Sequence, residues 1–238
     1  MLHSINLNNI LFLDIETVPQ HAAFQEAPPV MQDLWKKKSV TVTREEEATP
    51  ESIYRRAGIY AEFGKVICIS CGYFAADKKF RLKSFYGDDE KKILMEFSEM
   101  LQKFFMKSDR LLCAHNGKEF DFPFLARRMI ILGLPLPSAL DTSGKKPWEV
   151  NHLDTMELWK FGDYKSYTSL LLLATILGIP TPKDDIDGSM VWEVYWKEKN
   201  LKRIVTYCQK DVLTVAQIIR RFKGQPLVPE TDVEIIAD

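Results

Sequence analysis

The chain has 238 residues, of which 46% are hydrophobic and 27% charged, with a formal net charge of -1 at pH 7. This composition is that of a globular chain with room for one large domain, and it excludes a protein that coats long stretches of duplex nucleic acid, which is usually strongly basic. No apolar run approaches the ~20 residues of a membrane span and the first residues lack a signal-peptide pattern, so we expect no membrane partner and a cytoplasmic location.

The first predicted element is a buried strand in "ILFLDIETVP", residues 10–19. Because side chains alternate along a strand, Asp14 and Glu16 are expected on one face at its end. The sequence places no Lys or Arg within six residues of this pair. A divalent cation is one way to compensate two such carboxylates, and a solvated turn at the strand exit is the other.

Two helices are expected in an insertion at about residues 18–64, one in 30–38 and one starting at Thr49, with Pro50 at its first helical position. Its aromatic residues Trp35, Tyr54 and Tyr60 could stack on bases, although core packing is the more common fate of such side chains. The stretches 65–75 and 79–87 predict an antiparallel hairpin. An amphipathic helix follows in 88–105.

The second half of the chain predicts a strand in 109–116, a helix in 121–133, and a strand leading into a helix in 148–158. The segments 169–179, 189–199 and 201–224 are expected to be helical. This order predicts an α/β fold, a mixed sheet of about five strands whose first three are antiparallel, flanked by helices. We expect one domain over residues 1–223 and a peripheral tail over 224–238.

Further acids stand near the predicted strand ends and on the last long helix. Asp121 begins a helix just after Asn116 and Gly117, and its alternative role is that of a helix N-cap. Tyr207 and Asp211 are four residues apart on one helical face, where a surface hydrogen bond is the alternative. Together, acids from such distant segments fit a two-metal site for phosphodiester cleavage.

The segments "DIET", "NGKEFDFPFL" and "YCQKD" resemble the three exonuclease motifs of the DEDD superfamily, in its tyrosine version, because Thr206 stands where the histidine version has His. The second motif, extended to Arg128, resembles in particular the proofreading domain of family-B DNA polymerases and stand-alone predicted exonucleases related to it. The resemblance spans about residues 8–222. It implies a ribonuclease H-like fold and removal of nucleotides from 3′ ends.

The resemblance also implies roles for particular residues. Two divalent cations, Mg²⁺ with Mn²⁺ able to replace it, would be bound by four carboxylates, which are named at the end of this paragraph. Tyr207 would orient or help deprotonate the attacking water. Thr17 and Asn116 would contact the terminal nucleotide. His115 and His152 are expected to be structural, and Asp154 an accessory residue. The metal ligands implied by the resemblance are Asp14, Glu16, Asp121 and Asp211.

We therefore expect a 3′-5′ exonuclease that acts on single-stranded ends, with DNA favoured over RNA. A repair or editing role would require a polymerase or repair protein acting in trans. The alternatives are a catalytically silent nucleic-acid-binding module of the same fold and a phosphatase of small nucleotides. The four cysteines, Cys68, Cys71, Cys113 and Cys208, are expected to be reduced and mostly buried.

Overall fold

The protein is described by a computed structural model that covers residues 4–43, 47–107, 109–163, 167–180 and 186–236. Its centre is a mixed sheet in the order β5-β4-β1-β2-β3-β6. The central strands β1, β2 and β3 are antiparallel, β4 and β5 run parallel to β1, and β6 runs parallel to β3. The strands are β1 (Ile10–Pro19), β2 (Gly64–Phe74), β3 (Phe80–Tyr86), β4 (Leu111–Ala114), β5 (Leu153–Asp154) and β6 (Val233–Ile235).

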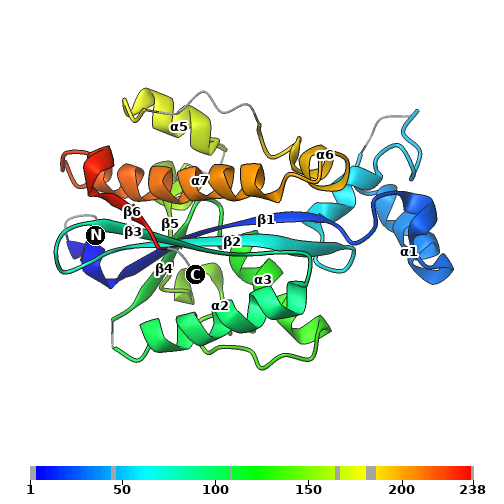
Figure 1. Ribbon diagram of the computed structural model, residues 1–238, viewed down its shortest axis with the longest axis horizontal. Helices are drawn as coiled ribbons and strands as arrows, with labels where there is room; N and C mark the ends of the chain where they lie inside the picture. The colour runs from blue at the N-terminus through cyan, green and yellow to red at the C-terminus, as the bar shows by residue number, and fades with distance from the viewer. Residues whose placement is uncertain (1–3, 44–46, 108, 164–166, 181–185, 237–238) are drawn as a thin grey trace.

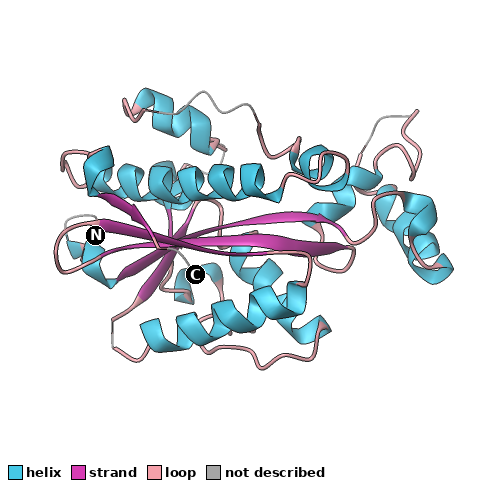
Figure 2. Ribbon diagram, viewed as in Figure 1, coloured by secondary structure: helices cyan, strands magenta, loops and turns pink. Residues whose placement is uncertain are grey.

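Helices cover both faces of this sheet (Figures 1 and 2). The long helix α7 crosses one face, with α5 and α6 beside it, and α2 and α3 cover the other face. The α/β class and the antiparallel start of the sheet are thus as predicted. The helices are α1 (Pro29–Ser39), α2 (Glu90–Phe104), α3 (Asp121–Ile131), α4 (Thr155–Lys160), α5 (Leu170–Ile176), α6 (Val191–Trp196) and α7 (Leu201–Phe222).

The apolar run of β1 is continuous because both of its faces are buried. Leu11 and Leu13 belong to the core cluster under α2 and α3, whereas Ile10 and Phe12 belong to the cluster under α7. The ladder between β1 and β4 ends at the pair Phe12 and Cys113. The second half of β1 therefore extends beyond the end of β4, and the strand face toward α7 continues there with polar residues.

The insertion contains one of the two predicted α-helices. α1 is present, but the segment beginning at Thr49 forms turns and a 3-10 helix over Tyr54–Ile59, so the predicted second helix is wrong. The reason is a close crossing of two backbone segments: a Cβ atom on Gly64 would lie 2.5 Å from the carbonyl oxygen of Gly58. The insertion's residues 44–46 lie outside the described part.

The aromatic side chains of the insertion form a core of their own. Trp35 is fully buried and packs edge-to-face on Tyr54 at 5.8 Å, and its Nε1 donates a hydrogen bond of 2.8 Å to the carbonyl oxygen of Pro50. Tyr60 packs against the same cluster. Trp35 and Tyr54 are therefore core residues, which was the more common alternative, and cannot stack on bases in this arrangement.

The tail contributes a strand that the sequence pattern did not predict. β6 pairs with β3 in parallel, with Val233 opposite Phe80. The sheet therefore has six strands, where about five were predicted. Residues 237–238 of the tail lie outside the described part. Within the described residues, no helix combines the length and the apolar character needed to cross a membrane. All four cysteines are free and buried.

Candidate active site

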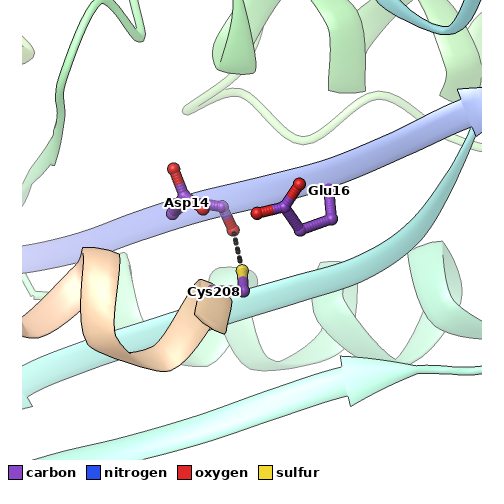
Figure 3. Close-up of side chains that lie close together, drawn as sticks. All are labelled: Asp14, Glu16 and Cys208. Atoms are coloured by element: carbon purple, nitrogen blue, oxygen red, sulfur yellow. Dashed lines mark hydrogen bonds between the residues drawn. The ribbon is translucent and has the colours of Figure 1, made fainter. Parts of the chain in front are cut away.

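Asp14 and Glu16 lie on the face of β1 that is turned toward α7, beyond the end of β4 (Figure 3). Glu16 is 7% exposed and Asp14 is half-buried. Burial raises the pKa of both carboxyls well above their ordinary values. Among the neighbouring charges, that of Glu16 raises the pKa of Asp14 most. The charge of Asp211 raises the pKa of Glu16 most. The predicted placement of the two acids on one strand face is thus found in the structure.

Helix α7 brings its own polar residues to the same place. Asp211 raises the pKa values of Asp14 and Glu16, so its carboxyl lies within electrostatic reach of both. Tyr207 is hydrogen-bonded to Asp211, and burial followed by the charge of Asp211 raises the pKa of its phenol far above the ordinary range. The phenol therefore keeps its proton at neutral pH, which favours an orienting role over deprotonation of a water.

Cys208 belongs to this cluster, which sequence reasoning did not recognise. Its thiol donates to the backbone carbonyl oxygen of Asp14 at 3.4 Å (Figure 3). Its sulfur and one carboxylate oxygen each of Asp14 and Glu16 lie within 4.8 Å of one another. The one available signal was its position directly after Tyr207 on the predicted helix.

Asp121 approaches the cluster from the other side, at the first residue of α3. It is 3% exposed, and its Oδ1 atom is buried without a hydrogen-bond partner. Burial raises the pKa of its carboxyl from 3.8 to about 7, against opposing hydrogen bonds from its own backbone N–H and from that of Ile15. The cap of α3 is Phe120, so Asp121 does not have the N-cap role that was its alternative.

The turn before α3 contains a second unpaired side-chain oxygen. Asn116 has a left-handed backbone with φ 61°, and its Oδ1 atom is buried without a partner. Gly117 is required beside it, because a Cβ atom there would lie 2.4 Å from the Cβ atom of Ala114. The turn is therefore packed too tightly to accept a side chain at Gly117, which fixes the backbone that carries Asn116.

Asp154, at the end of β5, holds this turn. Its carboxylate accepts backbone N–H groups from two segments, the turn and the start of α4, at distances of 2.9 to 3.3 Å: Asn116, Lys118, Met156 and Glu157. A carboxylate with four such donors is satisfied without a metal ion. We assign it a positioning role, which sequence reasoning had left open as an accessory residue.

The two histidines have their ring nitrogens occupied by structural hydrogen bonds. His115 pairs with the hydroxyl of Thr155 at 2.8 Å and with the carbonyl oxygen of Thr168 at 2.9 Å. His152 is bonded to the N–H of Leu112 at 3.2 Å and to the carbonyl oxygen of Ala139 at 2.6 Å. Both positions agree with the structural role expected for them.

Thr17 follows an irregularity in the sheet, because the register between β1 and β2 shifts between Glu16 and Thr17. Val18, the next residue, packs in the apolar cluster with α6 and α7. Strand alternation therefore does not fix the face of the Thr17 side chain. Its contact with a terminal nucleotide stays a prediction.

A buried ion pair fixes α3, and so Asp121, against the rest of the molecule. The Arg128 guanidinium donates two hydrogen bonds to the Glu90 carboxylate, at 2.8 and 2.6 Å, and one to the carbonyl oxygen of Ala61 at 2.8 Å. Glu90 also accepts the N–H of Val66. Arg128 is 3% exposed, so its charge is buried at the contact between α3 and α2 and does not face solvent.

Three of the acids, Asp14, Glu16 and Asp121, form a cluster of buried negative charge. Within the described ranges, no ion pair involves Asp14, Glu16 or Asp121. Three carboxyl pKa values raised by burial and by neighbouring acids, together with an unpaired carboxylate oxygen, are the features expected of an oxygen-rich site for hard divalent cations. The residues present therefore fit such ions.

Comparisons with known proteins agree with this geometry. Residues 59–223 match the model of a family described as a predicted 3′-5′ exonuclease related to the exonuclease domain of PolB. Asp121, Tyr207 and Asp211 lie inside the matched range. Asp14 and Glu16 lie before it, so their membership of the site depends on the tertiary structure.

Two archaeal polymerases are similar to the chain over a part of their length. A DNA polymerase of Pyrococcus glycovorans is 23% identical over 145 residues, covering 56% of this chain and 18% of the polymerase. The structure of the family B DNA polymerase from the hyperthermophilic archaeon Pyrobaculum calidifontis is similar with a TM-score of 0.51 and 16% identity, covering 90% of this chain and 27% of that one. The chain thus spans less than a third of either polymerase, and it has the ribonuclease H-like fold of a polymerase exonuclease domain.

Proposed function

The chain belongs to the family of predicted 3′-5′ exonucleases related to the exonuclease domain of PolB, and from that premise we propose that it is a divalent-metal-dependent nuclease that removes nucleoside monophosphates from the 3′ ends of single strands. DNA is the favoured substrate and RNA the second. The observation that supports this proposal is the electrostatic coupling of four acids from β1, α3 and α7, one of which, Asp121, has a buried carboxylate oxygen without a hydrogen-bond partner.

The acids Asp14, Glu16, Asp121 and Asp211 would hold two divalent cations, with Mg²⁺ as the physiological ion and Mn²⁺ as a substitute. When bound, such ions supply charge neutralisation for the scissile phosphate and activation of the attacking water. The phenol of Tyr207 keeps its proton and donates it to Asp211, and it would orient this water by accepting a hydrogen bond from it. Asn116, whose Oδ1 atom has no hydrogen-bond partner, would bind the terminal nucleotide.

A direct test follows 5′-labelled DNA and RNA strands of one sequence on a denaturing gel, with Mg²⁺, Mn²⁺ or a chelator. We expect a ladder that shortens from the 3′ end, disappears with the chelator and disappears in Asp14→Ala. Glu99→Gln, at an exposed carboxylate on α2, is the matched control and should keep full activity. Relative rates on the two strands would rank DNA against RNA.

The silent binding module is the competing function. It predicts that both strands stay intact with every metal while the protein still binds them. It gives no reason for three acids with raised pKa values to gather without a cation, since their mutual repulsion costs stability. Intact strands together with release of phosphate from a nucleoside monophosphate would instead favour the phosphatase alternative.

A further inference from the structure

A groove of about 750 Å³ lies along β5, the edge strand of the sheet next to the candidate site. All residues from Asn151 to Asp154 line it, with Lys118 at the end nearest the acids and Asn9 among those at the other end. Lys118 and Asp154 are joined by a backbone hydrogen bond of 3.1 Å in the same turn that holds Asn116. The groove is therefore continuous with the turn that borders the acidic cluster.

Two exposed aromatic rings stand at this groove. Trp148 is 75% exposed and Phe161 is 78% exposed, and they are the most exposed aromatic side chains in the described part of the chain. Large exposed apolar side chains that line a concavity mark binding surfaces. Scattered surface residues would not be expected to line one groove in this way.

The backbone of Phe161 is held in an unfavourable conformation. It has φ 45° and ψ 34°, the left-handed region, at the C-terminal end of α4, where glycine is the favoured residue. The ring packs edge-to-face on Trp159 at 6.5 Å, which is itself stacked on Phe222 of α7. A large aromatic residue kept at a strained, exposed position indicates a role for the ring outside folding.

The charges around the groove favour bases over phosphates as its contents. Lys118 is paired with Glu157 at 2.7 Å, and the other charged residues that line the groove are Asp109 and Asp154, so its interior carries no surplus positive charge. Neutral amides of Asn9 and Asn151 supply hydrogen-bonding groups. A cation is available outside, where Lys146 Nζ lies 5.2 Å from the centre of the Trp148 ring.

We propose that this groove binds the bases of the single strand upstream of its 3′ end, with Trp148 and Phe161 as stacking platforms. Sequence-tolerant stacking on aromatic rings with phosphates turned to nearby cations is the general mode of single-strand binding. The proposal rests on the proposed function, and it adds a second contact that a short substrate cannot reach. A dinucleotide would occupy the acidic cluster alone, whereas a longer strand would also fill the groove.

The test compares a dinucleotide with an oligothymidylate of about eight nucleotides, within the site sizes found for single-strand binders. Binding of fluorescent strands to the full chain is measured by anisotropy in chelator, and hydrolysis in Mg²⁺. Trp148→Ala and Phe161→Ala should each weaken binding of the longer strand and raise its KM by about fivefold or more, and leave dinucleotide hydrolysis unchanged. Met106→Ala, at a residue 83% exposed that does not line the groove, is the control.

Phe161→Gly separates a role in binding from a role in folding. Glycine relieves the left-handed backbone, so this variant should melt at a slightly higher temperature than the wild type and still bind the longer strand more weakly. Equal affinity of wild type and all groove variants for the longer strand, or no binding of it by the wild type, would overturn the groove proposal. Hydrolysis of neither strand by the wild type, with binding still dependent on Trp148, would overturn the exonuclease and leave the groove standing.

Discussion

Replacing Asp121 by Asn should make the protein more stable in the absence of metal, although it removes a residue proposed to be essential for activity. The carboxyl has a pKa raised from 3.8 to about 7 because it is buried, so at pH 8 it is ionised at a cost. A shift of about three pKa units, at about 1.4 kcal/mol per unit, corresponds to a cost of roughly 4 kcal/mol in the free energy of folding when this carboxyl is ionised. Asn keeps a carbonyl oxygen that can accept the N–H of Ile15, so little is lost in exchange.

The sign of the pH dependence follows from the direction of the shift. A folded pKa above the unfolded value means that the folded state binds the extra proton, so the wild type loses stability as pH rises from about 4 through about 7. Below this window Asp121 is neutral in the folded state, and the wild type and Asp121→Asn should be alike. Above it, the variant should be more stable by about 1–4 kcal/mol, or about 2–4 °C in Tm per kcal/mol.

The assay is urea or thermal unfolding in chelator at pH 5, inside this window, where the advantage of the variant should be smaller, and at pH 8, where it should be complete. The proteins compared are the wild type, Asp121→Asn and the control Glu99→Gln. The control should follow the wild type at both pH values because its carboxyl is exposed. A variant less stable than the wild type at pH 8, or a difference of the same size at both pH values, would refute the reasoning that a buried, uncompensated charge dominates this site.

Four further outcomes are expected. Mg²⁺ or Mn²⁺ at about a hundred times its Kd should stabilise the wild type by about 2.7 kcal/mol at pH 8 and far less at pH 5, because the acids must be ionised to bind it; equal melting shifts at both pH values would contradict this. Asp154→Ala leaves four backbone N–H groups without their acceptor and should cost about 3 kcal/mol or more in urea unfolding, against no change if the turn is held otherwise. Glu90→Gln leaves the Arg128 guanidinium buried without its charge partner and should cost about 3–5 kcal/mol, whereas a loss under 1 kcal/mol would show that water replaces the pair. Tyr207→Phe should lower kcat about a hundredfold with KM and Tm nearly unchanged, and an unaltered kcat would remove this phenol from the reaction.

Local sequence patterns determined much of the molecule. The period of two in β1 placed Asp14 and Glu16 on one face, and the period of α7 placed Tyr207 beside Asp211, because both periods are properties of the local backbone. The hairpin of β2 and β3 followed from two β-rich runs around a short turn. Motif spacing then indicated the family, which the comparison over residues 59–223 confirmed.

Only the tertiary structure decided the remaining features, because each depends on segments far apart in the chain. β6 exists by pairing with β3, whose unpaired edge no local pattern reveals. The segment after Thr49 is kept out of an α-helix by the close approach of Gly58 and Gly64. Asp154 reaches back to the Asn116 turn across 38 residues, and Cys208 reaches the backbone of Asp14 across 194. Sequence periodicity reports which face a side chain takes, whereas the partner it meets there is set by how the sheet and helices pack.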